Sequence, residues 1–277
     1  MTSTNYGLSH YIKRGLFYAL VIFIVLVFLF PFLWMVFSSL KPNVDLLHLP
    51  PHLFSMYTLD NYQSVFFETE FASRMVSSTI VSGGAVLTAL LLGLPASYVI
   101  ARYKYRNAAL GILFTRMIPG ISLLVPWFII YRNLNILDTY IGLIASHLVL
   151  TIPLVVWVMI GFFEDLPVEL EESARIDGCG RWQAFYKIAL PLVRPGIATS
   201  AILSFIFSWN HFLFALILSG SRTRTLPVTI FQFMTYEEID FGGLYAAATL
   251  ITLPVIIFVL LIQRQFISGL TMGGVKG

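Results

Sequence analysis

Six apolar stretches, each long enough to cross a bilayer, constrain the fold of this chain more than any other feature. A membrane-spanning helix needs about 20 apolar residues, and its backbone N–H and C=O groups must be paired within the helix. Only 11% of the 277 residues are charged, whereas a soluble domain has roughly 25%. The sequence therefore predicts an all-α integral membrane protein with spans at 16–38, 77–99, 109–130, 141–163, 197–219 and 244–262.

Lysine and arginine are unevenly divided among the connections between these spans. One set of connections carries Lys13, Arg14, Arg102, Lys104, Arg106, Arg175, Arg181, Lys187, Arg194, Arg264 and Lys276. The other set carries only Lys41, Arg74, Arg132, Arg222 and Arg224. Because basic connections stay in the cytoplasm, this bias predicts that both termini and the connection 164–195 are cytoplasmic.

The connection 164–195 is strongly polar, and its pattern predicts two short helices. Pro167 suits a first helical position, because its missing N–H would have no intrahelical partner there. Gly178 follows Asp177 where a left-handed residue would end the first helix. The helix dipole favours negative charge near a helix N-terminus, and the first helix has three glutamates in its N-terminal half: Glu169, Glu171 and Glu172.

The second predicted helix has an apolar face and ends at Leu190-Pro191. The face is spaced i, i+3, i+4 and i+7, and consists of Trp182, Phe185, Tyr186 and Ala189. A cytoplasmic helix pair of this kind is a natural docking surface for a soluble partner. The alternative is a pair of amphipathic helices lying on the lipid surface, although three glutamates suit an anionic inner leaflet poorly.

The same connection resembles the signature of permease subunits of ATP-binding-cassette importers. That signature is Glu-Ala-Ala, three residues, Gly, nine residues and Ile-x-Leu-Pro. The chain matches it, with Ser173 in place of the first Ala, at Glu172, Ser173, Ala174, Gly178, Ile188, Leu190 and Pro191. The Leu40-Lys41-Pro42 segment and the closing segment 269–277 also look like the second permease of maltose-type carbohydrate importers.

The resemblance implies a six-span type I importer permease fold in the inner or plasma membrane, a sugar substrate, and several partners. These are a second, different permease, an ATPase dimer and an extracytoplasmic sugar-binding protein. It also implies that residues 172–178, Asp177 included, form a coupling helix seated in a cleft of one ATPase. ATP and Mg would bind to the ATPase, so this chain would bind no cofactor itself.

The expected organisation is one membrane domain with short additions at each end. Residues 1–71 would hold the N-terminal segment, the first span and an extracytoplasmic loop. Residues 72–263 would form the importer core, with the coupling loop at 164–195. Residues 264–277 would be a cytoplasmic tail, and its glycines suit a flexible strand contacting the ATPase, with a frayed terminus as the alternative.

Two further groups of residues are candidates for contact with the cargo and its carrier. Polar residues inside spans often mark a transport path, and the candidates here are Arg116, Trp209, Asn210 and His211. A purely structural role is the alternative for each of them. The segment 219–243 could reach a binding protein through Arg222 and Arg224, or could pack on its own spans.

The sequence has no P-loop, no H-E-x-x-H and no G-x-S-x-G, and its five histidines have no metal-ligand spacing. We therefore expect no catalytic residue, no metal site and no nucleic-acid partner. Two alternatives to a sugar permease stay open at this point. One is an importer permease for another solute, such as glycerol phosphate or an oligopeptide; the other is a membrane scaffold or intramembrane enzyme.

Overall fold

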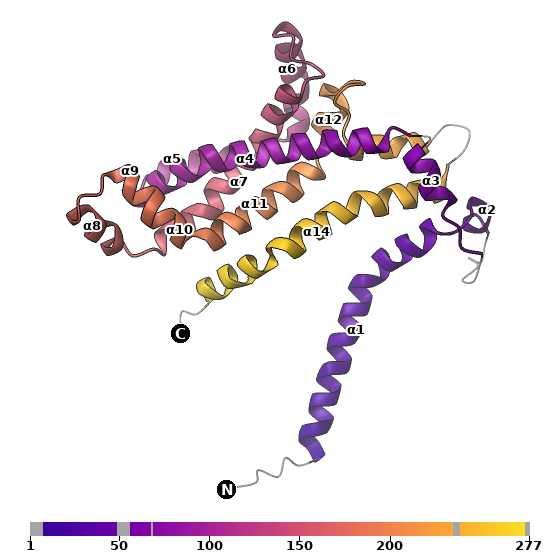
Figure 1. Cartoon of the computed structure of the whole chain (residues 1–277), viewed down its shortest axis with the longest axis horizontal. Helices are drawn as coiled ribbons and strands as arrows, with labels where there is room; N and C mark the ends of the chain where they lie inside the picture. Colours follow the sequence, from indigo (N-terminus) through magenta and orange to yellow (C-terminus); the bar gives the residue numbers. More distant parts are fainter. Residues whose placement is uncertain (1–7, 49–55, 68, 235–238, 275–277) are drawn as a thin grey trace. The chain divides into compact units, whose positions relative to one another are not determined.

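The computed structural model describes residues 8–48, 56–67, 69–234 and 239–274, with side chains described between positions 13 and 261. The described residues are almost entirely helical, and a lone β-bridge joins Met234 to Ile239. The helices are α1 (Leu8–Ser39), α2 (Asn43–Leu46), α3 (Asp60–Phe67), α4 (Phe71–Tyr103), α5 (Arg106–Thr115), α6 (Gly120–Asn133), α7 (Tyr140–Glu164), α8 (Glu169–Ile176), α9 (Arg181–Ala184), η1 (Phe185–Ala189), α10 (Leu190–Leu192), α11 (Arg194–Trp209), α12 (Leu213–Leu218), α13 (Leu226–Thr229), η2 (Ile230–Phe233) and α14 (Phe241–Gly274) (Figure 1).

Among the described residues, four helices are long and apolar enough to cross a membrane, namely α1, α4, α7 and α14. Two bent pairs bring the number to six if each pair is one span. The segments Arg106–Thr115 and Gly120–Asn133 meet at 82°, and Arg181–Leu192 meets Arg194–Trp209 at 76°. The span expected at 109–130 is therefore sharply bent, and the span expected at 197–219 is divided between α11 and α12.

The breaks have local causes that a hydropathy pattern does not reveal. The residue before a proline is disfavoured in the α conformation, and Pro119 follows the end of α5 by four residues. Pro119 itself is extended, with φ −59° and ψ 128°, and caps α6. In the fifth predicted span, α11 ends at Trp209 and α12 begins only at Leu213.

The chain divides into two compact units, Met1–Thr69 with Phe233–Leu250, and Glu70–Gln232 with Ile251–Gly277. In the first unit, side-chain hydrogen bonds organise the Leu40-Lys41-Pro42 segment and its surroundings. The Nδ2 group of Asn61 donates to the carbonyl oxygens of Ser39 and Lys41, each at 2.8 Å. Asn43 donates to Asp240 and accepts from the Gly242 N–H, both at 2.7 Å, which ties α2 to the start of α14.

The second unit is built on close packing between α4 and α7. A Cβ atom added at Gly93 of α4 would lie 2.7 Å from Cγ1 of Val155, so the two helices approach too closely for a larger residue. Small residues allow this approach between membrane helices. The two helices run together along the unit, with α11 against both of them (Figure 1).

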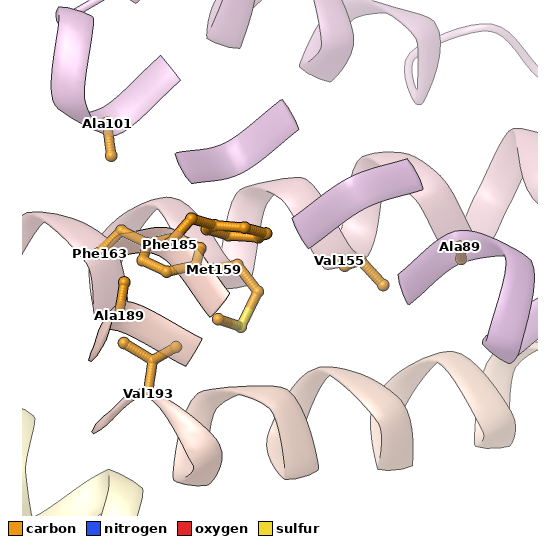
Figure 2. Packing of buried hydrophobic residues seen from close by; sticks show 8 residues of the cluster. All are labelled: Ala89, Ala101, Val155, Met159, Phe163, Phe185, Ala189 and Val193. Carbon is orange, nitrogen blue, oxygen red and sulfur yellow. The ribbon is translucent and has the colours of Figure 1, made fainter. Parts of the chain in front are cut away.

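Two apolar clusters hold this unit together. Figure 2 shows the one that joins α4 and α7 to the 164–195 connection: Ala89, Ala101, Val155, Met159, Phe163, Phe185, Ala189 and Val193. The second cluster joins α4, α6, α7 and α12 through Val81, Leu124, Tyr131, Leu143, Phe214 and Leu218. The C-terminal end of α4 and the 164–195 connection lie together at one end of the unit. The N-terminal end of α4 marks the opposite end.

At the chain's C-terminus, the backbone of α14 is helical through Gly274. The predicted flexible strand is therefore wrong at Gly273 and Gly274. Residues 275–277, which include Lys276 and Gly277, lie outside the described residues.

Candidate functional site

In the motif loop, residues 164–195, α8 begins at Glu169, two residues after the predicted start at Pro167, and a glycine cap ends this helix as predicted. Gly178 has φ +91°, a left-handed conformation that L-residues with a side chain rarely adopt. The Gly178 N–H donates to the Arg175 carbonyl at 3.1 Å, and the Cys179 N–H donates to the Ala174 carbonyl at 3.0 Å. These two bonds form a Schellman motif. The Ala-x-x-x-Gly spacing of the signature therefore has a physical basis, because Ala174 supplies the carbonyl and Gly178 the left-handed turn.

Ser173, the departure from the signature, fits α8 without disturbing its packing. The residue is exposed, and its hydroxyl donates to the Glu169 carbonyl one turn back at 2.8 Å. The polar group is thus satisfied within the helix. The substitution of Ala by Ser leaves the buried face of α8 unchanged.

The second helix of the motif loop differs from the prediction. It runs through α9, a π-helical turn at Phe185–Ala189 and α10, so Leu190-Pro191 continues the helix instead of stopping it. The π turn pairs the Leu190 N–H with the Phe185 carbonyl. It also breaks the 3.6-residue period, and the predicted apolar face is split: Phe185 and Ala189 are buried, whereas Trp182 and Tyr186 are 68% and 49% exposed.

The predicted coupling residues divide between an inner and an outer face of the motif loop. Ala174 is buried, and Ile188, Leu190 and Pro191 are half-buried. The outer residues Glu172, Ser173, Asp177 and Gly178 are exposed. Apolar side chains lie on the outside as well, since Ile176 is 87% exposed. A surface hollow between the two helices is lined by Glu172, Arg175, Ile176, Cys179, Gly180 and Arg181.

Sequence reasoning missed a buried ion pair beneath α8. The Arg102 guanidinium, at the end of α4, donates to Oε1 of Glu171 from Nε at 2.8 Å and from Nη2 at 2.5 Å. Tyr98, also on α4, donates its hydroxyl to Oε2 of the same carboxylate at 2.5 Å. The only sequence signal for this role is that Glu171 lies three residues before Ala174, a small apolar residue, and so on the same helix face.

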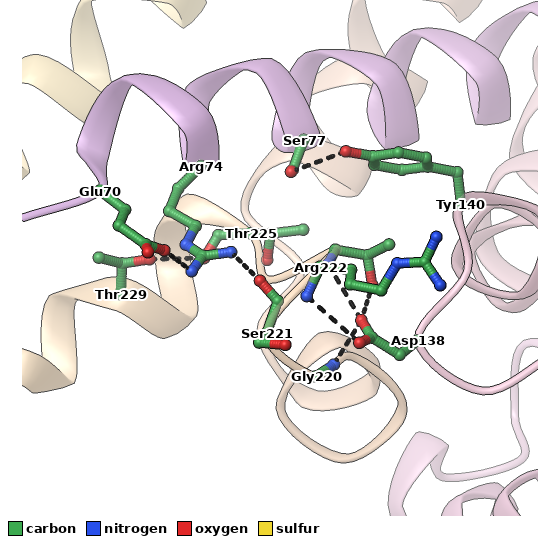
Figure 3. Close-up of polar contacts among 11 residues, drawn as sticks. Glu70, Arg74, Ser77, Asp138, Tyr140, Gly220, Ser221, Arg222, Thr225 and Thr229 are labelled. Atoms are coloured by element: carbon green, nitrogen blue, oxygen red, sulfur yellow. Dashed lines mark hydrogen bonds and ion pairs between the residues drawn. The ribbon is translucent and has the colours of Figure 1, made fainter.

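At the opposite end of the unit, Asp138 holds the segment 219–225. Its carboxylate accepts hydrogen bonds from the backbone N–H groups of Gly220, Arg222 and Thr223 and from the Thr223 hydroxyl, at 2.7–3.2 Å (Figure 3). Burial alone would raise the pKa of Asp138. The four hydrogen bonds, with that from the Thr223 hydroxyl the largest contributor, outweigh burial and hold the pKa below its ordinary value.

Arg74 fixes the same segment from α4. Its guanidinium donates to the Ser221 carbonyl at 2.5 Å and pairs with Glu70 (Figure 3). The two predicted binding-protein contacts lie on this pinned segment, Arg222 exposed and Arg224 half-buried. The segment 219–225 is thus an ordered surface that presents at least one arginine. Residues 235–238 of the predicted contact loop lie outside the described residues.

The four predicted path residues have different surroundings. Trp209 is 2% exposed and donates its indole N–H to the Ile251 carbonyl at 3.1 Å. Asn210 is exposed at the end of α11, with its amide donating to the Ile206 carbonyl at 2.9 Å. Arg116 is exposed at the end of α5, where its guanidinium lies 5.7 Å from the centre of the Phe207 ring.

His211 lies beside a histidine that the sequence did not single out. Its ring centre is 5.1 Å from that of His147 on α7. His147 is 1% exposed, and its Nδ1 is 2.7 Å from the Ser208 hydroxyl. Trp209, the last residue of α11, therefore contacts α14, and His211, just after α11, contacts α7. Within the described residues, no group of three or more His, Cys, Asp or Glu could hold a metal ion.

The helical membrane architecture and the motif loop define a permease of the ATP-binding-cassette importer class. Residues 89–271 match the family described as the binding-protein-dependent transport system inner membrane component. The chain belongs to this family. It is accordingly a multi-pass integral membrane protein and the transport subunit of its system, with ATP hydrolysis on a separate subunit.

Individual relatives agree with this assignment. The chain is 38% identical over 257 residues to the trehalose transport system permease protein SugB of Mycobacterium tuberculosis, covering 90% of this chain and 93% of the relative. It is 33% identical to the trehalose/maltose transport system permease protein MalG of Thermococcus litoralis, covering 96% and 98%. A crystal structure of a bacterial transporter that imports alginate matches the fold with a TM-score of 0.76 at 21% identity, over 95% of this chain and 100% of that one.

Proposed function

We propose that this chain is one of two different permeases in an ATP-driven, binding-protein-dependent sugar importer. In this proposal its motif loop couples an ATPase dimer to the membrane spans. The observation that carries the coupling role is the outer face of α8, a capped helix that presents Glu172 and an 87% exposed Ile176. An exposed aliphatic side chain beside a carboxylate on a rigid helix suits insertion into a cleft of a soluble partner.

The six spans follow from hydropathy, and the charge bias of the connections predicts that both termini and the motif loop lie in the cytoplasm. The opposite end then faces the binding protein. There the pinned segment 219–225 offers Arg222 and Arg224 as contacts. An ordered surface binds a partner at lower entropic cost than a mobile loop.

A carbohydrate cargo is favoured over glycerol phosphate or an oligopeptide by the relatives, whose names specify trehalose and maltose. Within this chain, Asn210 and Arg116 are the exposed path candidates, whereas Trp209 is buried and its N–H donates to the Ile251 carbonyl. We therefore assign Trp209 a supporting role on the path and Asn210 and Arg116 the contacts with sugar hydroxyls.

The test uses the complete importer in proteoliposomes, after a panel of sugars has identified the ligand of its binding protein. Glu172→Lys places a positive charge on the outer face of α8, and Gly178→Pro destroys the cap. Each variant should abolish uptake while the permease still reaches the membrane. Glu164→Gln, an exposed carboxylate at the start of the same loop, is the matched control and should transport normally. Normal uptake by both loop variants would refute the coupling role.

A further inference from the structure

The ion pair between Arg102 and Glu171 joins three elements that have different positions in the chain. Besides its bonds to Glu171, the Arg102 Nη1 group donates to the Phe163 carbonyl at 2.9 Å and to the Leu166 carbonyl at 3.0 Å. Phe163 lies in the last turn of α7, and Leu166 lies in the connection to α8. One guanidinium thus ties the end of α4 to the end of α7 and to the motif-loop helix.

The surroundings of this pair leave it little contact with solvent. The side chains of Arg102 and Glu171 are only 11% and 7% exposed. The Tyr98 ring packs against Phe163 and Phe185, with ring centres 5.5 Å and 4.8 Å apart. These two phenylalanines belong to the apolar cluster shown in Figure 2. We call the Arg102–Glu171 pair, with the bonds from Arg102 to the Phe163 and Leu166 carbonyls, the joint. Both carboxylate oxygens and all three nitrogens of the guanidinium therefore have partners in a packed environment.

A buried ion pair contributes little net stability, because desolvation offsets most of the attraction between its charges. Its contribution here is geometric. The motif loop is part of the chain segment between α7 and α11, whereas α4 is separated from it in the chain by α5, α6 and α7. Besides the apolar packing, the described contacts that bind α4 to α8 run through Arg102 and Tyr98, and all of them end on Glu171.

We propose that Arg102 and Glu171 are positioning residues that transmit movement of the motif loop to α4. This inference rests on the coupling function proposed above. When the ATPase displaces α8, the bidentate pair carries α4 along, and the two carbonyl bonds keep the end of α7 in register with it. Movement then reaches three helices of the core: α7 and α11 through the chain, and α4 through the ion pair.

The test follows the far end of α4 in the intact importer complex. A cysteine replaces Val76, which is 56% exposed near the N-terminal end of α4, and Cys179→Ser removes the native thiol. The complex is reconstituted in nanodiscs, and the rate of maleimide labelling is measured with and without ATP and vanadate. In the parent chain this treatment should change the labelling rate. Arg102→Gln and the isosteric Glu171→Gln should each reduce that change at least tenfold, while the complex still hydrolyses ATP and copurifies with its ATPase.

Three controls separate transmission from folding. Glu164→Gln and Arg106→Gln neutralise exposed charges near the joint and should leave the response intact. Arg102→Lys keeps the charge but cannot span the carboxylate and both carbonyls, so it should restore only part of the response. Loss of the ATPase from the Glu171→Gln complex would show that the pair builds the docking surface, and would overturn the transmission role.

The remaining outcomes distinguish this inference from the proposed coupling function. If Glu172→Lys abolishes the response and Glu171→Gln leaves it normal, coupling stands and the joint is refuted. If Glu172→Lys also leaves the response normal, the coupling function itself fails, and the joint fails with it. In the parent chain, ATP and vanadate could also leave the labelling rate of Val76→Cys unchanged. That result would show that α4 does not move, and would refute the role of the joint as well.

Discussion

Replacing Gly178 by alanine should loosen the end of α8 through backbone strain alone. Gly178 has φ +91°, and a Cβ atom added there would meet nothing within 4 Å. The new methyl group therefore causes no collision. Its cost is the left-handed conformation of an L-residue, about 1–2 kcal/mol. That free energy corresponds to a roughly 5- to 30-fold shift in the equilibrium between the closed and the open cap.

Hydrogen exchange followed by mass spectrometry measures this shift directly. In the closed cap, the Gly178 and Cys179 N–H groups are bonded to the Arg175 and Ala174 carbonyls. In Gly178→Ala, exchange in this peptide should accelerate about 5- to 30-fold. In Gly178→Asn the acceleration should be smaller, because asparagine tolerates the left-handed region better than alanine does.

The matched control is Gly161→Ala in the helix α7. A Cβ atom at Gly161 also meets nothing within 4 Å, but its backbone is helical, so alanine is tolerated there without strain. Exchange at the α8 cap should not change in this variant. Unchanged exchange in Gly178→Ala, or equal acceleration in both variants, would refute the account of the Ala-x-x-x-Gly spacing.

Three further predictions concern the core and the opposite end of the second unit. Asp138→Ala removes four hydrogen bonds to a partly exposed carboxylate, and should destabilise the segment 219–225 by about 2–4 kcal/mol, seen as faster amide exchange at Thr223. Unchanged exchange would contradict the role of Asp138 in holding this segment. Because the folded pKa of Asp138 is lowered, its contribution is complete at neutral pH, and should fade only as the pH falls below about 3.9 and through the folded value. An amide-exchange titration checks this, and loss of protection already at pH 6 would be inconsistent with it. Gly93→Val should cost about 1–3 kcal/mol by overpacking against Val155, measured as a lower thermal midpoint, and an unchanged midpoint would exclude the close approach of α4 and α7.

The sequence predicted the long helices well, because hydropathy over about 20 residues is a strong local signal. Four of the expected spans fall within α1, α4, α7 and α14. The other two are bent or broken, because the prolines and polar residues that interrupt them act on backbone geometry and not on mean hydropathy. Pro119 illustrates this, since it lies inside an apolar stretch and yet caps a new helix at 82° to the last one.

In the motif loop, the sequence predicted the glycine cap of α8 but not the long-range ion pair between Glu171 and Arg102. The glycine that ends α8 follows from its position after a helical pattern, and the structure confirms it. The π turn at Phe185–Ala189 has no comparable sequence signal, and the predicted apolar face of the second helix was wrong at Trp182 and Tyr186. Glu171 was interpreted as a dipole-stabilising charge, because nothing local connects it to Arg102, which lies 69 positions earlier in the chain.

The sidedness of the motif loop is the most direct test of the whole account. Cys179→Ser removes the single native cysteine, and Arg181→Cys then places one thiol on the exposed surface of the loop. Arg222→Cys, on the opposite end, is the matched comparison. A membrane-impermeant maleimide should label Arg181→Cys in inside-out vesicles and not in intact cells, with the reverse pattern for Arg222→Cys. Labelling of Arg181→Cys from outside intact cells would contradict the account, because no cytoplasmic ATPase could then reach the loop.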